Sequence, residues 1–279
     1  MTDGFKIKSY KNLNSFRENS MAFWEKNESQ NSLFWEVTRR FQEERKPLSC
    51  ANVFKNGVIR SSFLKIDTNY ILLSAGSFHT VKNIVRYSEK KKWKIKGVLG
   101  SKIDAEIFES LSGKDLGRKT ENEKNLFYIF ETGRFLKKNP EKPAGELVKA
   151  KHSDWPRIRV WAGNFARESG HGASEHRTIS LAKEMLEDDG LFLFKNNNQC
   201  LAMAGFDRST SNRLVINMVY VPEDMRGKGY GTNMILEMNF LARTIGFPKC
   251  ILFSEQNLAK NLYKNMGCRQ VGDFCELEF

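Results

Sequence analysis

The chain has 279 residues, of which 40% are hydrophobic and 28% are charged. This length suffices for one large domain or two small ones, and the ordinary composition excludes disordered, collagen-like and fibrous proteins. No apolar run reaches the roughly 18 residues that a membrane helix needs, and the N-terminal residues are too polar for a secretory signal.

The net charge of +12 is distributed unevenly along the chain. Residues 1–140 contain 27 basic and 16 acidic residues, whereas residues 141–279 contain 18 and 17. The densest basic run comprises Lys90, Lys91, Lys92, Lys94 and Lys96. Such a run either attracts an acidic partner or is the solvated end of a helix that leads into an edge strand. We favour the second interpretation and expect no nucleic-acid partner.

The cysteines and histidines show no metal-ligand spacing. Five cysteines lie in apolar surroundings, and no two form a C-x-x-C pair: Cys50, Cys200, Cys250, Cys268 and Cys275. We therefore expect reduced core thiols in a cytoplasmic protein, with no metal and no membrane contact.

Hydrophobic periodicity in the first half predicts an α/β domain. We expect a first helix capped by Ser15, further helices at 32–45, 80–91 and 103–111, and strands at 51–54, 58–66, 70–74, 97–99 and 125–131. Between Thr132 and Gly145 the composition shifts to glycine, proline and lysine. We place the domain boundary there, between an N-terminal domain at 1–140 and a C-terminal domain at 145–279.

The second half predicts a more complete series of elements. We expect strands at 146–149, 191–194, 200–206, 214–221, 250–253 and 270–278, and helices at 155–167, 174–186, 231–245 and 258–266. This order, β-α-α-β-β-β-α-β-α-β, is that of a whole α/β unit. The first half shows an incomplete version, which indicates an internal duplication.

A glycine-rich turn follows the predicted strand at 214–221. Gly227, Gly229 and Gly231 lie just before or at the start of the next helix. Free amides at a helix N-terminus bind phosphate, glycines let the backbone approach it, and Arg226 and Lys228 add positive charge. The spacing excludes a P-loop and a dinucleotide fingerprint. A purely structural turn is the alternative.

A second motif lies 26 residues beyond Gly231. The segment Asn257-Leu-Ala-Lys-Asn-Leu-Tyr263-Lys-Asn-Met-Gly-Cys268 resembles the N-x-x-A-x-x-x-Y-x-x-x-G-[FY] signature of the GNAT acetyltransferase superfamily. The two motifs occur in the order typical of that family and span residues 146–279. Cys268 departs from the family's aromatic preference, which affects packing rather than chemistry.

The resemblance implies a GNAT fold, a mixed and splayed central sheet flanked by helices, with acetyl-CoA as cosubstrate. The pantetheine arm would lie along the strand at 214–221, beside Val219, Tyr220 and Val221, and close to Asn257. The pyrophosphate would bind the amides of Arg226, Gly227, Lys228, Gly229, Tyr230, Gly231 and Thr232.

Tyr263 would stand near the cofactor sulfur and protonate the leaving thiolate. Its alternative role is that of an aromatic residue packed on the sheet. The strand at 214–221 has no carboxylate to serve as a base, and Asn217 cannot accept the proton. Glu168, Glu175 and His176 lie in the helical region that shapes the acceptor pocket in the family, but we interpret them as solvated helix residues. We therefore expect water to carry the proton away.

The N-terminal half resembles the degenerate half of two-domain GNAT proteins, because residues 51–131 have similar elements without an Arg-x-x-Gly-x-Gly loop. Together these features predict transfer of an acetyl group to a primary amine of a small molecule, an amino acid or a peptide. A non-catalytic acyl-CoA sensor and a nucleic-acid-associated protein that uses the basic half are the alternatives.

Overall fold

The computed structural model describes residues 4–43, 49–66, 69–113, 125–133, 136, 144–169, 174–254 and 259–278. The chain divides into two compact units. The first unit comprises Met1–Ile129 together with Val271–Phe279, and the second comprises Phe130–Gln270. The C-terminal segment therefore belongs to the first unit, a division that differs from the sequential boundary expected at 140–145.

The described residues of the first half form ten principal elements. In order these are β1 (Phe5–Tyr10), α1 (Leu13–Trp24), α2 (Ser32–Glu43), β2 (Ser49–Lys55), β3 (Val58–Lys65), β4 (Tyr70–Leu73), α3 (Phe78–Lys90), β5 (Gly97–Gly100), α4 (Lys102–Leu111) and β6 (Asn125–Glu131), with a short 3-10 turn, η1 (Glu25–Asn27), after α1.

The second half repeats this order. Its elements are β7 (Glu146–Lys149), α5 (Trp155–Glu168), α6 (Glu175–Glu187), β8 (Leu191–Asn196), β9 (Gln199–Ser209), β10 (Arg213–Tyr220), α7 (Tyr230–Thr244), β11 (Lys249–Ser254), α8 (Ala259–Asn265) and β12 (Arg269–Glu278), with short 3-10 turns η3 (His152–Asp154) and η4 (Glu223–Met225).

The internal duplication is complete. The first half begins with a strand, β1, that was not expected from the sequence and that corresponds to β7 of the second half. With β1 included, both halves have the order β-α-α-β-β-β-α-β-α-β. The first helix also begins earlier than expected. Asn12 caps α1, since its Oδ1 accepts a hydrogen bond from the backbone N–H of Ser15 at 2.8 Å, so Ser15 is not the cap.

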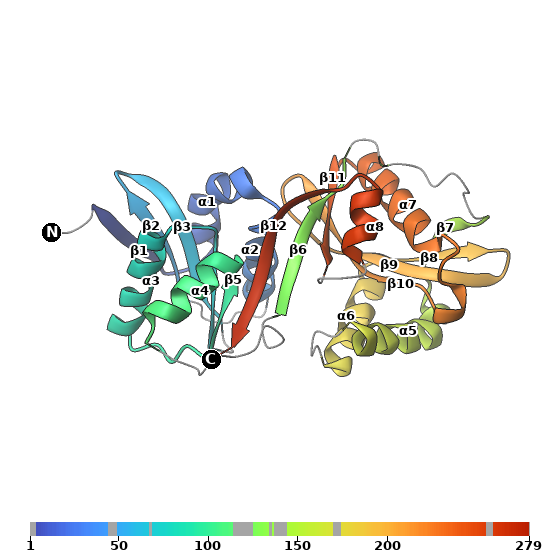
Figure 1. Ribbon diagram of the computed structural model, residues 1–279, viewed down its shortest axis with the longest axis horizontal. Coiled ribbons are helices and arrows are strands. Elements are labelled where there is room, and N and C mark those ends of the chain that lie inside the picture. The colour runs from blue at the N-terminus through green and yellow to red at the C-terminus, as the bar shows by residue number, and fades with distance from the viewer. Residues whose placement is uncertain are drawn as a thin grey trace. The chain divides into compact units, whose positions relative to one another are not determined.

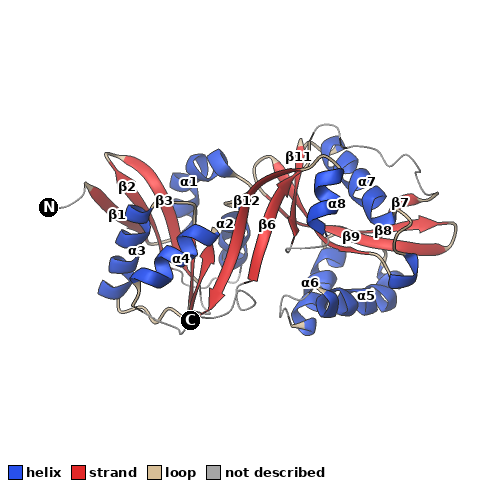
Figure 2. Ribbon diagram, viewed as in Figure 1, coloured by secondary structure: helices blue, strands red, loops and turns tan. Residues whose placement is uncertain are grey.

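The two halves exchange their last strands. In the first unit the strand order is β1-β2-β3-β4-β5-β12, and β12 pairs antiparallel with β5 from Cys275 opposite Gly100 to Glu278 opposite Gly97. In the second unit the strand order is β11-β10-β9-β8-β7, and β6, of which only Phe130 and Glu131 belong to this unit, is the other neighbour of β11. Each half thus receives its final strand from the other half (Figures 1 and 2).

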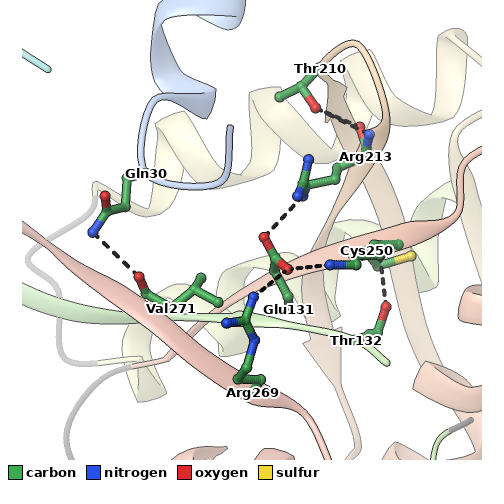
Figure 3. Close-up of polar contacts among 9 residues, drawn as sticks. Gln30, Glu131, Thr132, Thr210, Arg213, Cys250, Arg269 and Val271 are labelled. Atoms are coloured by element: carbon green, nitrogen blue, oxygen red, sulfur yellow. Dashed lines mark hydrogen bonds and ion pairs between the residues drawn. The ribbon is translucent and has the colours of Figure 1, made fainter. Parts of the chain in front are cut away.

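Hydrophobic packing and polar contacts hold β12 in the first unit. Cys275 and Leu277 are fully buried in a core cluster that includes Val98 of β5. Gln30 Nε2 donates to the carbonyl of Val271 at 3.4 Å (Figure 3), and the backbone N–H of Lys102 donates to Asp273 Oδ1 at 2.8 Å.

The end of β6 is held in the second unit by charge. Glu131, whose side chain is 6% exposed, accepts hydrogen bonds from Arg213 Nε at 3.0 Å, Lys249 Nζ at 2.9 Å and Arg269 Nη2 at 3.4 Å (Figure 3). The next residue, Thr132, accepts the backbone N–H of Cys250 on its hydroxyl at 2.7 Å. These contacts join β6 to the first residues of β10 and β11 and neutralise a buried carboxylate.

Helices cover both faces of the sheet in the second unit. In Figure 1 α5 and α6 lie on one face, and α7 and α8 lie on the other. The α5–α6 face packs Trp161 and Met185 against strand residues such as Met203, Met218 and Tyr220. The sheet therefore lies between α7, the helix that follows the glycine-rich turn, and the pair α5 and α6.

The basic run is the exposed end of α3, as the favoured interpretation predicts. Lys90 ends the helix, Lys91 is its C-cap, and cations stabilise this end of the helix dipole. The expected edge strand is wrong, however, because β5 has β4 on one side and β12 on the other. All five cysteines are buried and free. Within the described residues, every helix falls short of the length and apolar character that crossing a bilayer requires.

Candidate active site

The central strand β10 separates from β11 halfway along its length. The two strands pair in parallel only from Arg213 opposite Lys249 to Ile216 opposite Leu252. Beyond that point β10 bulges against β9, where its pairing shifts between Asn217 and Tyr220. The bulge places Met218 at φ +52°, and Met218 N–H donates to Asn217 Oδ1 at 2.7 Å. The splayed sheet that the resemblance implies is therefore present, and its vertex lies at Asn217.

A tight turn connects β10 to α7 through the glycine loop, by which we mean residues 226–232. The preceding η4 turn uses the N–H groups of Met225 and Arg226, which donate to the carbonyls of Pro222 and Glu223. Gly227 and Gly229 have φ of +76° and +81°, conformations that glycine adopts without strain.

The glycine loop presents unused amides at the start of a 15-residue helix. Gly229 is the N-cap of α7, so no side chain caps this end, and the first bond inside the helix joins Asn233 N–H to the Gly229 carbonyl. Within the described part of the chain, no acceptor is recorded for the amides from Gly227 to Thr232. Such a set of donors, together with the positive end of the helix dipole, suits an anion.

Packing within the protein does not require glycine at two positions of this loop. A Cβ at Gly231 would meet only Val221 Cγ2, at 3.5 Å, and a Cβ at Gly227 would meet nothing within 4 Å. The space beside these residues is open. It is therefore available for a ligand that lies directly against the backbone.

The charged side chains of the loop are already engaged. Arg226 donates to the Val221 carbonyl through Nε at 3.0 Å and to Glu168 through Nη2. The hydrogen bond to Glu168 raises the pKa of Arg226. Lys228 Nζ donates to the Asp224 carbonyl at 3.0 Å.

The three strand residues predicted to bind cofactor differ in burial. Val219 and Val221 are half-buried beyond the last β11 partner, whereas Tyr220 is 5% exposed and packs on Trp161 with ring centroids 5.9 Å apart. The Tyr220 ring thus belongs to the core, and its hydroxyl accepts a hydrogen bond from Asn164 Nδ2 at 3.2 Å. In the loop, the Tyr230 ring packs in a tilted arrangement on the Phe194 ring, with ring centroids 6.2 Å apart.

Tyr263 lies on α8 and is 5% exposed. Its ring packs edge-to-face on Phe130 of β6, with centroids 5.6 Å apart, and among the described residues no hydrogen bond is recorded for its hydroxyl. Burial raises its pKa well above the usual phenol range, with a smaller contribution from Cys268, so the phenol keeps its proton at neutral pH. Asn257, the other residue taken from this motif, lies outside the described residues.

The carboxylates near the helices pair with arginines. Glu168 is bound to Arg226, and Glu175 pairs with Arg167 at 2.7 Å, while His176 is exposed. The sequence analysis missed a further carboxylate, Asp207, because it ended the preceding strand at Phe206. In the structure β9 extends to Ser209, and the Asp207 side chain is 7% exposed.

A cleft of about 530 Å³ opens beside η4. Its walls come from the start of α5, the turn between β8 and β9, and the residues that precede the glycine loop, including Arg157, Trp161 and Met225. The Arg157 guanidinium lies 2.7 Å from the Cys200 sulfur at the edge of this cleft. The second unit therefore has open space on the approach to the loop.

Residues 155–268, which contain the splayed strand and the glycine loop, match the model of the acetyltransferase (GNAT) family. This segment is therefore similar to the acetyltransferase domain of the GNAT family. The resemblance drawn from the two motifs is thereby confirmed. Comparison with curated protein sequences gave no significant match.

Solved structures extend the likeness in fold to both halves. A GNAT family acetyltransferase from Colwellia psychrerythraea is 15% identical with a TM-score of 0.62, over 98% of this chain and 99% of that one. A GCN5-related N-acetyltransferase from Sphaerobacter thermophilus is 12% identical with a TM-score of 0.60, over 100% and 96%. A Drosophila protein is 10% identical with a TM-score of 0.63, over 99% of both chains. The predicted mixed α/β GNAT fold is confirmed, and it includes the N-terminal half.

Proposed function

We propose that the second unit is an N-acetyltransferase that moves the acetyl group of acetyl-CoA to a primary amine of a small molecule, an amino acid or a peptide, without a metal. One arrangement carries the proposal. In a GNAT domain, strand β10 leaves β11 and runs directly into a helix N-terminus with unused amides.

The two parts of this arrangement suit the two ends of the cofactor. The amides from Gly227 to Thr232 would bind the pyrophosphate, because they are donors without recorded acceptors at the positive end of α7. The pantetheine arm would follow β10 along Val219 and Val221, where β11 no longer pairs and the backbone of β10 has room for a new partner.

In the proposed reaction the amine nitrogen attacks the thioester carbon directly. The new C–N bond forms, the C–S bond breaks, and the sulfur leaves as a thiolate that needs a proton. Tyr263 would supply that proton, because its buried phenol is protonated at neutral pH and no other hydrogen bond is recorded for it among the described residues. The amine's own proton would leave through water.

The test combines binding and turnover in the full-length protein. Calorimetric titration with acetyl-CoA should show a single site. Incubation with acetyl-CoA and a panel of glycine, lysine, spermidine, tyramine and a short unblocked peptide should release free thiol with at least one amine. Binding without thiol release from any amine would instead favour a non-catalytic acyl-CoA sensor. Absence of binding would contradict the proposal.

A further inference from the structure

A polar cluster lies at the vertex where β10 leaves β11, and neither sequence motif includes it. The cluster consists of Asp207 and Arg208 of β9, Asn217 of β10 and the ring of Phe253 of β11. Asp207 Oδ2 accepts hydrogen bonds from Arg208 Nη1 at 2.5 Å and from Asn217 Nδ2 at 3.1 Å. The Arg208 guanidinium lies over the Phe253 ring, 5.2 Å from its centroid.

A bulge in β9 produces this cluster. Arg208 pairs with Val215 and Phe206 pairs with Ile216, so Asp207 is an extra residue in the strand. Neighbouring residues of a regular strand point to opposite faces, but a bulge changes the direction of one side chain. As a result the side chains of Asp207 and Arg208 form an ion pair, and they are only 7% and 14% exposed.

Asn217 connects the carboxylate to the splay. Its Nδ2 donates to Asp207, while its Oδ1 accepts the N–H of Met218, the residue with positive φ in the β10 bulge. Two bulges, one on each strand, are thus joined through a single amide side chain. A carboxylate that is held in this way has a fixed position at the vertex.

One oxygen of Asp207 remains available. Both recorded hydrogen bonds use Oδ2, and none is recorded for Oδ1 among the described residues; because Oδ1 is also absent from the fully buried atoms without a partner, part of its surface is open. Arg208 and Asn217 both donate to the same oxygen and so hold the carboxylate in one orientation. An ionised carboxylate with one free oxygen is suited to accept an N–H group.

The distance along β10 places this oxygen near the proposed thioester. Val221 lies four residues beyond Asn217, which corresponds to about 13 Å of strand. An extended pantetheine arm that starts at the glycine loop and follows β10 back toward the vertex spans a similar length. Its sulfur would then lie close to Asn217 and Asp207.

The cluster lies on the sheet face opposite to α7. Asn217 pairs with Gly205, where an added Cβ would collide with the Met185 side chain of α6, so this face is the one that α5 and α6 cover. A molecule that contacts Asp207 would therefore approach from the side of α5 and α6. The phosphates would be bound by the glycine loop at the start of α7, on the other face of the sheet.

We propose that Asp207 is the residue that binds the acceptor amine, an inference that rests on the proposed acetyl transfer. Asp207 Oδ1 accepts an N–H of the neutral amine and directs the nitrogen lone pair at the thioester carbon. As the C–N bond forms, positive charge develops on nitrogen, and the carboxylate stabilises it. The C–S bond then breaks, the sulfur takes a proton, and one nitrogen proton passes to water. The products are an amide and free coenzyme A.

Asp207→Asn tests this role with little change in shape. The amide oxygen keeps both hydrogen bonds from Arg208 and Asn217, but the amide NH₂ replaces Oδ1 and opposes a developing positive charge. With the amine of the panel that gives the highest wild-type kcat/KM, kcat/KM should fall about 10²–10³-fold. The Kd for acetyl-CoA, measured by calorimetry, should stay within about twofold of the wild-type value, which corresponds to roughly 0.4 kcal/mol.

Asp189→Asn is the matched control, because Asp189 is an exposed carboxylate of the same unit, 72% accessible, and pairs with Lys149 at 3.3 Å. It should leave kcat/KM unchanged. Equal kcat/KM in Asp207→Asn and the wild type would overturn the inference alone. A parallel loss of acetyl-CoA binding in Asp207→Asn would also overturn it, because the residue would then be structural. Failure of the wild-type protein to acetylate any amine would overturn the proposed function itself.

Discussion

Tyr220 Oη donates a hydrogen bond to Glu168 Oε1 at 3.3 Å, which joins the end of β10 to the end of α5. The other oxygen of Glu168 holds Arg226, whose guanidinium also lies over the Tyr220 ring at 5.8 Å. Glu168 therefore places a negative charge beside the loop in which we expect the pyrophosphate to bind.

Glu168→Gln should strengthen acetyl-CoA binding. The substitution keeps the side-chain shape and one acceptor oxygen, which Arg226 can retain, while the amide NH₂ faces the Tyr220 hydroxyl; it removes a charge that repels phosphate. Because the Glu168 side chain is 45% exposed, we expect a gain of about two- to fivefold that shrinks as salt screens the charges. Calorimetric titration at low and high ionic strength measures it. Weaker binding at both would instead show that Glu168 is needed to position Arg226.

Gly231→Ala should weaken acetyl-CoA binding without harming the fold. The new Cβ meets only Val221 at 3.5 Å, an ordinary contact, but it occupies the open side of the loop where the phosphates would approach. We expect a loss of about tenfold or more, roughly 1.4 kcal/mol, and a larger loss for Gly231→Val. Phe240→Ala, at an exposed site on the same helix, is the control. Wild-type affinity in both Gly231 variants would argue against phosphate binding at this loop.

Tyr263→Phe separates catalysis from packing. The variant keeps the edge-to-face contact with Phe130 and loses no recorded hydrogen bond, so thermal stability should barely change. If the phenol protonates the thiolate, turnover should fall about 10²–10⁴-fold at constant affinity for acetyl-CoA. Tyr87→Phe, which likewise removes a hydroxyl and keeps an edge-to-face ring contact in the first unit, is the control. Wild-type turnover in Tyr263→Phe would leave this residue with a packing role only.

The buried thiols should make stability fall at alkaline pH. Burial raises the pKa of Cys50 and Cys250 to about 12 and that of Cys268 to about 11, from an ordinary value of 9.0. Below pH 9 both the folded and the unfolded chain keep these protons, so the stabilisation is complete. Between pH 9 and about 12 only the unfolded chain ionises, and the stabilisation is lost.

Guanidinium denaturation at pH 7, 9 and 10 measures this loss. A variant in which all three cysteines are replaced by alanine should show a shallower decline with pH, even though it is less stable at pH 7 because of the cavities. Identical slopes in the two proteins would assign the alkaline loss to other groups.

Replacing Lys90, Lys91 and Lys92 with glutamine should leave acetyl transfer unchanged at every ionic strength. These lysines end α3, and Lys91 Nζ lies over the Tyr87 ring at 5.6 Å, so their role is local. We expect a loss of stability of about 0.3–1 kcal/mol per charge at most. A deficit in kcat/KM that appears at low salt and disappears at high salt would reveal an electrostatic role in substrate attraction.

Most elements could be predicted from local patterns, and the exceptions have physical reasons. Phe5–Tyr10 was missed because its lysines and serine make it resemble a loop, although polar residues are typical of a strand at the sheet edge. The glycine loop was found because a helix N-terminus has a local sequence signature. The geometry of the glycine loop is set by a few consecutive residues, so a single-sequence pattern can reveal it.

Two other features depend on contacts that no local pattern encodes. The last strands of the two halves have similar alternating patterns, so the sequence contains no sign that β12 pairs with β5 and β6 lies beside β11. Asp207 was missed because its position depends on a register shift opposite Val215 and Ile216, and such a shift is a property of two strands together.

The exchange of β6 and β12 has a consequence for biosynthesis. Residues 271–279 are synthesised after the whole second unit, yet Cys275 and Leu277 complete the core of the first unit, most of which is translated before it. Until they emerge, the β5 backbone groups that face β12 are unpaired, and Val98 lacks its cross-strand partner Leu277. The first unit therefore cannot complete its folding before the second unit has been translated, as it would in the usual N-to-C order of domain folding. The first unit must wait, partly formed, for the final segment, and a premature stop codon anywhere in the second half would damage both units at once.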